Sequence, residues 1–226
     1  MSGASYDRLA DAYSAFQDAN AAYYRVADDA LRRLLGPGEG RCLDVGCGGG
    51  RVLALLADLG WAPVGVDESE DQLRVAGERV PGAQLVRADA HALPFADESF
   101  DGAVSTFTHT DVENFARAIA EAKRVLRAGA RLVYVGNHPC FVGPAQEHTD
   151  SGVPVLHPGY RDAGRHMSAF ARGATPGGWR TTLGSFIHLP LGEFLAAFSG
   201  LTLVAAEELD DGWDYPKTIA LAFSKP

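Results

Sequence analysis

Cysteines and long apolar runs are scarce in this sequence, and each scarcity argues against a class of protein. The three cysteines, Cys42, Cys47 and Cys140, are odd in number and lack the spacing of a metal site. No hydrophobic run approaches the roughly 18 residues of a membrane span, and residues 1–10 lack the apolar stretch of a signal peptide. We therefore expect a reduced, soluble and cytoplasmic protein with no metal site and no membrane partner.

Basic residues are also fewer than acidic ones. The sequence has 20 Lys and Arg and 29 Asp and Glu, which gives a formal net charge of −9. A protein that wraps nucleic acid needs a basic face to displace phosphate counterions, so we expect no nucleic-acid partner. The composition is otherwise ordinary, with 46% hydrophobic and 22% charged residues over 226 positions. Length and composition together predict one large globular domain.

The order of the apolar patterns predicts an α/β fold. Residues 6–35 have helical periodicity, which the Gly36-Pro37-Gly38 sequence stops. Short apolar runs at 41–45, 62–66, 84–87, 102–105 and 131–135 then alternate with helical segments at 51–59, 69–79 and 112–127. Such alternation indicates a parallel sheet with helices on both faces.

Local signals mark the ends of two of these helices. Ser69, with Gln72 three residues later, forms a capping-box pattern at the start of the helix at 69–79. Asp111 is the expected N-cap of the helix at 112–127. We expect Gly129 to end that helix, because glycine takes the left-handed conformation without steric cost.

The segment at 137–185 differs from the rest, with five prolines, eight glycines and no sustained period. Segments of this length inside a domain are usually lids or binding loops. A short helix at 191–198 and strands at 201–205 and 218–223 are predicted after it. We find no internal repeat and no second domain.

A glycine-rich turn between the first predicted strand and the next helix is the most informative motif. It reads Asp-x-Gly-x-Gly-x-Gly, with Asp44 followed by Gly46, Gly48 and Gly50. Glycines let the backbone turn sharply and approach a ligand, with the amides of the next helix close by. The dinucleotide fingerprint G-x-G-x-x-G fails at its last position, where Arg51 stands, which speaks against a nicotinamide or flavin cofactor.

Two acidic residues follow at the ends of the next two predicted strands. Asp67 lies 23 residues beyond Asp44 (67 − 44), at the mouth of the neighbouring strand, where a carboxylate can accept both hydroxyls of a ribose. Asp89 ends the third strand and could accept the exocyclic amine of an adenine. The alternatives are a helix cap at Asp67 and a surface turn at Asp89.

Together these residues resemble the class I S-adenosylmethionine-dependent methyltransferases, of the small-molecule, UbiE-like type with a Y-D-x-x-A-x-x-Y opening. The resemblance covers roughly residues 6–136. Its motifs are Tyr6-Asp7-Arg8-Leu9-Ala10-Asp11-Ala12-Tyr13, Leu43-Asp44-Val45-Gly46-Cys47-Gly48-Gly49-Gly50, Val64-Gly65-Val66-Asp67, Ala88-Asp89-Ala90 with Leu93-Pro94-Phe95, and Glu121-Ala122-Lys123-Arg124-Val125-Leu126-Arg127 with Gly129.

The resemblance implies a Rossmann-like, seven-stranded, mostly parallel sheet whose last strand is antiparallel. It divides the single domain into a helical cap at 1–36, a cofactor-binding core at 37–136, a substrate lid at 137–188, and a C-terminal helix with strands at 189–226. The implied cofactor is S-adenosyl-L-methionine, with S-adenosyl-L-homocysteine as the product. The implied partner is a small-molecule acceptor, such as a natural product or a quinone in secondary metabolism.

The resemblance assigns different residues of this sequence to the methionine, the ribose and the adenine of the cofactor. Asp44 and the glycines line the methionine, Asp67 holds the ribose, and Asp89 holds the adenine. The full set of implied cofactor-binding residues is Tyr13, Asp44, Gly46, Cys47, Gly48, Asp67, Glu68, Asp89, Ala90, Ser105 and Thr106.

Histidines supply the candidate bases, which are needed only when the acceptor must lose a proton. His109 follows the fourth strand and His138 the fifth, at the sheet edge where ligands bind, so we expect both to be catalytic. His148, His157, His166 and His188 also fall near the lid, without a carboxylate at metal-binding spacing. Arg161, Arg165, Arg172 and Arg180 could clamp an anionic substrate or form a solvated face.

Two other functions remain open on the residues alone. The chain could bind the same cofactor for a reaction in which the methyl group does not move, or it could be a binding module without activity. The histidine-rich lid favours an enzyme over a sensor. The sequence specifies neither the acceptor atom nor the oligomeric state.

Overall fold

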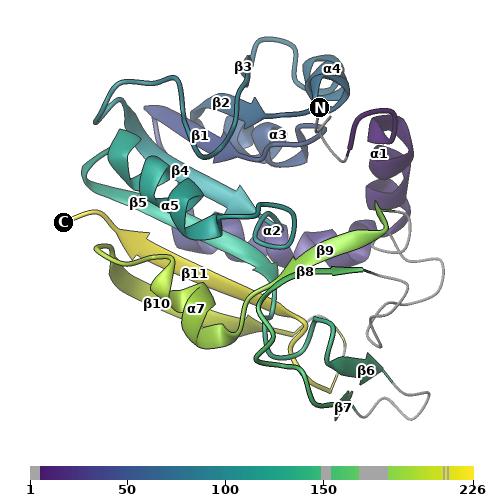
Figure 1. Ribbon diagram of the computed structural model, residues 1–226. Helices are drawn as coiled ribbons and strands as arrows, with labels where there is room; N and C mark the ends of the chain where they lie inside the picture. Colours follow the sequence, from purple (N-terminus) through teal and green to yellow (C-terminus); the bar gives the residue numbers. More distant parts are fainter. Residues whose placement is uncertain (1–5, 149–153, 168–182, 211, 213) are drawn as a thin grey trace.

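A single seven-stranded sheet organises the molecule (Figure 1). The computed structural model describes residues 6–148, 154–167, 183–210, 212 and 214–226. In chain order the strands of this sheet are β1 Arg41–Val45, β2 Ala62–Asp67, β3 Gln84–Arg87, β4 Phe100–Thr106, β5 Leu126–Asn137, β10 Thr202–Leu209 and β11 Thr218–Ser224. Their spatial order is β10-β11-β5-β4-β1-β2-β3. Only β11 runs antiparallel to its neighbours β5 and β10, so the expected Rossmann-like sheet is confirmed.

Helices cover both faces of the sheet, as the alternating patterns predict. Helices α2 Ala21–Leu35, α3 Arg51–Asp58 and α4 Glu70–Arg79 pack on one face, and α5 Phe115–Val125 and α7 Leu191–Ala196 pack on the other. The strand β1 is buried between these layers, with Cys42 and Leu43 fully shielded from solvent. None of the helices in the described ranges has an apolar stretch long enough to cross a lipid bilayer.

Between β3 and β4, the chain crosses to the other side of β1, so the direction in which strands are added to the sheet changes. Strands β1, β2 and β3 add outward in one direction, and β4 then pairs with the opposite side of β1. Ligands of open α/β sheets bind in the crevice that this reversal leaves at the carboxyl ends of the strands. The fold therefore places the turns after β1 and β4 at one site.

The boundaries of α5 differ from the prediction. Asn114, not Asp111, caps the helix, because its side-chain oxygen accepts the Arg117 amide at 3.1 Å. The helix ends at Val125, where the last carbonyls are taken by the amides of Glu98 and Ser99 from the loop before β4. The expected stop at Gly129 is wrong for this reason, because the chain has already entered β5 there.

The lid region contains strands that the sequence did not predict. Strands β6 Gln146–His148 and β7 Pro154–Leu156 form one antiparallel pair, and β8 Gly164–Met167 and β9 Ser185–His188 form another. The Ile187 amide of β9 donates to the Thr110 carbonyl at 2.7 Å, so the β8–β9 pair is tied to the loop after β4. Arg172 and Arg180 lie outside the described residues.

Helix α1 (Ala10–Ala19) lies across α4 instead of packing on the sheet (Figure 1). Both oxygens of the Asp11 carboxylate accept from the Arg74 guanidinium at 2.8 Å. The Asp7 carboxylate accepts from the Ser69 hydroxyl at 2.8 Å. These polar contacts fix the N-terminal cap above the ends of β1 and β2.

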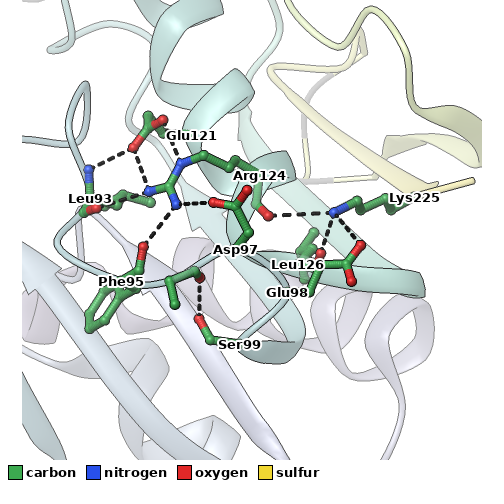
Figure 2. A network of polar contacts seen from close by, with 10 residues as sticks. Leu93, Phe95, Asp97, Glu98, Ser99, Glu121, Arg124, Leu126 and Lys225 are labelled. Atoms are coloured by element: carbon green, nitrogen blue, oxygen red, sulfur yellow. Dashed lines mark hydrogen bonds and ion pairs between the residues drawn. The ribbon is translucent and has the colours of Figure 1, made fainter.

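Arg124 in α5 holds the loop between β3 and β4 (Figure 2). Its guanidinium donates to the Leu93 and Phe95 carbonyls, at 3.0 and 2.8 Å, and to the carboxylates of Asp97 and Glu121. Glu121 in turn accepts the Leu93 amide at 2.9 Å. A planar fork with five donors suits this task, because a point charge such as lysine could not reach all four groups.

We expect Arg124→Met to lower the free energy of unfolding by about 2 to 4 kcal/mol, because it orphans two carbonyls and the Glu121 carboxylate. Urea unfolding of the variant beside wild type measures this loss. Arg127→Met is the matched control, since Arg127 is half exposed and forms an ion pair with Asp101. Its loss should stay below about 1 kcal/mol. Equal losses in the two variants would refute the role given to Arg124.

Candidate active site

A cavity of about 410 Å³ opens at the carboxyl ends of β1, β2 and β4. This volume lies within the range of small-molecule sites. Its walls come from the turns after β1, β2, β3 and β4, from the N-terminal segment, and from β8. Eight of the predicted cofactor residues line it, namely Tyr13, Gly46, Gly48, Asp67, Glu68, Asp89, Ala90 and Thr106.

The other three predicted cofactor residues lie close by without lining this cavity. Cys47 lines a small adjoining cavity that shares Gly46 and Gly48 as walls. Asp44 and Ser105 are buried behind the lining, at 1% and 2% exposure. The Ser105 hydroxyl contacts the Val45 carbonyl and the Thr108 hydroxyl, so it joins the turn after β1 to the loop after β4.

The turn after β1 requires its glycines. Gly46 has φ +74°, and a Cβ there would lie 2.5 Å from the Thr108 methyl carbon. Gly50 has φ +78° and faces the backbone of Ala76, at 3.0 Å from the position of a Cβ. Left-handed backbone at these positions is costly for other residues. The amides of Gly46 and Cys47 both donate to the Val66 carbonyl, so the turn is fixed to β2.

Asp67 joins this turn to the start of α4. One carboxylate oxygen accepts the Gly48 amide at 2.9 Å, and the other accepts the Ser69 amide at 2.9 Å. Burial raises the pKa of Asp67, whereas these two amide donors oppose the rise. The predicted capping box is thus only half formed. The Ser69 hydroxyl accepts the Gln72 amide at 3.2 Å, but Asp67 takes the place of the Gln72 side chain at the Ser69 amide.

Asp44 is a buried carboxylate without a partner. Its side chain is 1% exposed, and neither oxygen has a hydrogen-bond donor among the described residues. Burial raises the pKa of Asp44 to about 7, and the nearby Arg51 guanidinium opposes this shift. An unpaired buried carboxylate is costly, so its position beneath the Gly46–Gly48 turn fits a site that receives a cationic or donor group.

Arg51 explains why the dinucleotide fingerprint fails at this position. Its guanidinium forms an ion pair with Asp28 of α2 and lies 4.9 Å from the centroid of the Tyr24 ring. It also lines the small cavity beside the glycine turn. The side chain therefore ties the turn to the N-terminal cap, a contact that a glycine could not make.

The turn after β3, for which the resemblance implies adenine binding, also lines the cavity. One oxygen of Asp89 accepts the His91 amide at 2.9 Å and contacts the His91 ring nitrogen at 2.6 Å. The amide donor and the His91 ring lower the pKa of Asp89, which keeps the carboxylate ionised. Asp89, Ala90 and His91 all line the cavity.

Two aromatic residues of the wall were missed from the sequence. Tyr6 lines the cavity with Tyr13, and their ring centroids are 5.1 Å apart. Phe107 lines both cavities and has φ +57°, a left-handed backbone that is strained for a bulky residue. Its ring packs against Tyr23 and Tyr24 of α2. No sequence signal marks such strain at a non-glycine residue.

The two histidines predicted as catalytic do not line the cavity. His109 is 2% exposed, and its ring bonds to the Tyr134 hydroxyl and packs against Phe115 and Phe194. His138 is 3% exposed and lies 3.0 Å from the Glu208 carboxylate. Burial lowers the pKa of His138, and Glu208 opposes that shift.

We call the part of the lining that comes from the loop after β4 and from β8 the free end of the cavity. The residues there are Thr108, Asp111, Val112, Glu113 and Arg165. Arg165 donates to the Glu113 carboxylate and to the Ser185 hydroxyl, each at 2.9 Å, so its guanidinium spans this end. Of the two lid arginines among the described residues, Arg161 and Arg165, the cavity lining includes Arg165.

Across the described ranges, no group of three or more His, Cys, Asp or Glu side chains is placed to hold a metal ion. The polar side chains at the cavity are carboxylates, hydroxyls, the Gln72 carboxamide, the His91 ring and the Arg165 guanidinium. They suit an adenosyl sulfonium compound, because Asp67 can hold a ribose, Asp89 an adenine, and Asp44 an ammonium group.

Comparison with known proteins agrees with this geometry. Residues 43–134 match the methyltransferase domain family. Over 159 residues the chain is 38% identical to a demethylmenaquinone methyltransferase of Renibacterium salmoninarum, a match that covers 64% of this chain and 66% of the relative. It is 40% identical over 134 residues to the O-methyltransferase cnsE of Penicillium expansum, covering 53% of this chain and 49% of the relative. The matches thus span less than two thirds of these relatives.

The fold matches over a longer range. A solved S-adenosylmethionine dependent methyltransferase from Mesorhizobium loti superposes with a TM-score of 0.70 and 25% identity, covering 87% of this chain and 96% of that protein. The sheet order, the glycine turn and the acidic residues after β2 and β3 are the features that the sequence resemblance implied. The family match, the sequence relatives and the superposed structure together support a class I S-adenosylmethionine-dependent methyltransferase.

Proposed function

We propose that this protein transfers a methyl group from S-adenosylmethionine to a small-molecule acceptor. The proposal is carried by one cavity, whose lining includes both Asp67 and Asp89 and the free-end residues Glu113 and Arg165. The cofactor end and the free end thus share a single space. An acceptor at the free end would lie beside the cofactor, as an in-line displacement requires.

The chain's contribution to this chemistry is alignment. When bound, the cofactor supplies an activated methyl group on a sulfonium that departs as a neutral thioether. Asp67 and the glycine turn fix the position of the ribose and the methionine. Phe107, whose amide donates to the Val135 carbonyl, lines the same cavity. Alignment of this kind accounts for a large part of a transfer rate.

An acceptor that must lose a proton needs a base that reaches the cavity. His109 and His138 are set back from it, whereas Asp111 and Glu113 line its free end. Glu113 is paired with Arg165. We assign the proton-accepting role to Asp111 and give His109 a positioning role, because its ring anchors the loop that carries Thr108 and Asp111 to Tyr134.

The acceptor class follows from the relatives and from the free end of the cavity. One relative is named for a quinone precursor, demethylmenaquinone, and another for O-methylation. Val112 and Phe107 offer apolar contact to a ring, while Arg165 can pair with an oxyanion. A hydroquinone or phenol-like natural product therefore fits best.

The function is tested in two steps. Isothermal calorimetry with S-adenosylhomocysteine should show binding by wild type and about 10- to 100-fold weaker binding by Asp67→Asn, which loses a charged acceptor. Asp58→Asn, an exposed surface change, is the control and should bind as wild type does. Incubation with S-adenosylmethionine and a panel of hydroquinones and phenols should then release S-adenosylhomocysteine and a methylated product.

Two results would contradict this function. The absence of any heat of binding with wild type would refute the cofactor assignment. Binding and conversion of a panel compound without release of S-adenosylhomocysteine would indicate a reaction in which the methyl group stays on the cofactor.

The raised pKa of Asp44 predicts how cofactor affinity depends on pH. With a pKa of about 7, this carboxyl is largely protonated in the free protein below pH 7. An ammonium group above it would favour the ionised form, so binding must release the proton. The affinity for S-adenosylhomocysteine should fall by up to about tenfold per pH unit as the pH drops from 7 to 5. Asp44→Asn should bind weakly with a flatter profile, and an unchanged slope would contradict the role.

The proton-accepting role of Asp111 has its own test. With an acceptor from the panel, single-turnover methyl transfer by Asp111→Asn should be about 100-fold slower than wild type, with cofactor affinity unchanged within about twofold. His109→Gln should alter stability more than the pH profile of the rate. If the rate of His109→Gln lost its pH dependence while the rate of Asp111→Asn stayed as in wild type, His109 would be the proton acceptor.

A further inference from the structure

Arg165 brings a positive charge to a cavity whose lining is otherwise acidic. Among the described lining residues it is the one Lys or Arg side chain. The carboxylates that share the lining are those of Asp67, Glu68, Asp89, Asp111 and Glu113. An acidic lining suits a cofactor with a sulfonium and an ammonium group, but it does not explain a guanidinium. Arg165 therefore needs an explanation of its own.

The position of Arg165 is fixed by the backbone of the lid. In the β8–β9 pair it lies opposite Ile187, whose amide donates to the Thr110 carbonyl at 2.7 Å. One nitrogen of the guanidinium also donates to the Ser185 hydroxyl at 2.9 Å. The strand pair and this hydroxyl together hold the guanidinium at the free end of the cavity.

The ion pair with Glu113 does not account for Arg165. The Glu113 side chain is 73% exposed and the Arg165 side chain 44%, and ion pairs as exposed as this add little to stability. The contact joins one guanidinium nitrogen to one carboxylate oxygen at 2.9 Å. Glu113 is therefore a partner that another anion can replace at small cost.

A carboxylate on the acceptor would be a better partner for Arg165 than Glu113 is. The guanidinium fork has five donors, and two parallel bonds to a carboxylate are stronger than one. Inside the cavity such a pair would also be less exposed to water than the present one. Val112 and Phe107 line the same cavity and offer apolar contact to an aromatic ring. Asp111, the proposed proton acceptor, lines it as well.

We propose that the acceptor is an aromatic acid, a phenol whose ring also carries a carboxylate, and that this carboxylate displaces Glu113 from Arg165. The inference rests on the proposed function and narrows its acceptor class. The carboxylate is the group recognised, and the hydroxyl is the group methylated. Arg165 then determines specificity, while Glu113 pairs with the guanidinium only until the acceptor binds.

The test compares hydroxybenzoates with the matching hydroxybenzamides, which lack the charge. Each compound is titrated by calorimetry into the protein saturated with S-adenosylhomocysteine. Wild type should bind at least one benzoate about tenfold more tightly than its amide, the factor for a charge-assisted hydrogen bond. Arg165→Gln should bind that benzoate about tenfold more weakly than wild type does, and the amide equally well.

Glu113→Gln should have the opposite effect, because it removes the competing anion. We expect it to bind the same benzoate roughly threefold more tightly than wild type does. Arg161→Gln is the matched control, since Arg161 is an exposed lid residue outside the cavity lining, and it should bind both compounds as wild type does. Weaker benzoate binding by both Arg165→Gln and Glu113→Gln would show that the ion pair only holds the lid, and would overturn the inference.

The remaining outcomes also decide. Arg165→Lys keeps the charge without the fork, so its benzoate affinity should lie between those of wild type and Arg165→Gln, and it serves as the test if Arg165→Gln does not fold. A benzoate preference that is unchanged in the Arg165 variants, or no preference in wild type, would overturn the inference. If neutral phenols alone bind and are methylated, only this inference fails. If wild type does not bind S-adenosylhomocysteine, the proposed function fails first.

Discussion

The Asp67 carboxylate is the contact on which the site depends. Its two oxygens hold the Gly48 amide of the turn after β1 and the Ser69 amide at the start of α4. These two backbone segments come from different βα units, so one side chain sets the distance between them. Because the turn must also follow its left-handed glycines, little freedom remains in the backbone around the cavity. The same carboxylate is left facing the space where a ribose would lie.

Several polar groups near this contact are buried without partners. Asp44 and Gln72 lie on opposite sides of the glycine turn, and neither has a hydrogen-bond partner among the described residues. Each lowers the stability of the free protein, because water is excluded and no protein group replaces it. The Arg124 guanidinium, by contrast, donates to four groups of the neighbouring loops (Figure 2).

Much of this arrangement could be predicted from local sequence. Gly46, Gly48 and Gly50 are needed for backbone reasons that act within a few residues, and Asp67 follows directly from the end of an apolar strand. The order of strands and helices likewise follows from local periodicity. The physical cause of each of these features lies in residues that are close together in the sequence.

The direction of side chains after β4 could not be predicted in this way. A tight turn, in which the amides of Asp111 and Val112 bond to the Thr108 carbonyl, sends His109 into the aromatic core and leaves Asp111 at the cavity. That outcome depends on Phe115, Tyr134 and Phe194, which come from three separate elements. The start of α5 was misplaced by the same turn, since it delays the helix to Phe115. The crystal structure of the protein grown with S-adenosylhomocysteine tests the account most directly. It should show the ribose at Asp67 and the adenine at Asp89, whereas a ligand bound elsewhere, or none under saturating conditions, would contradict it.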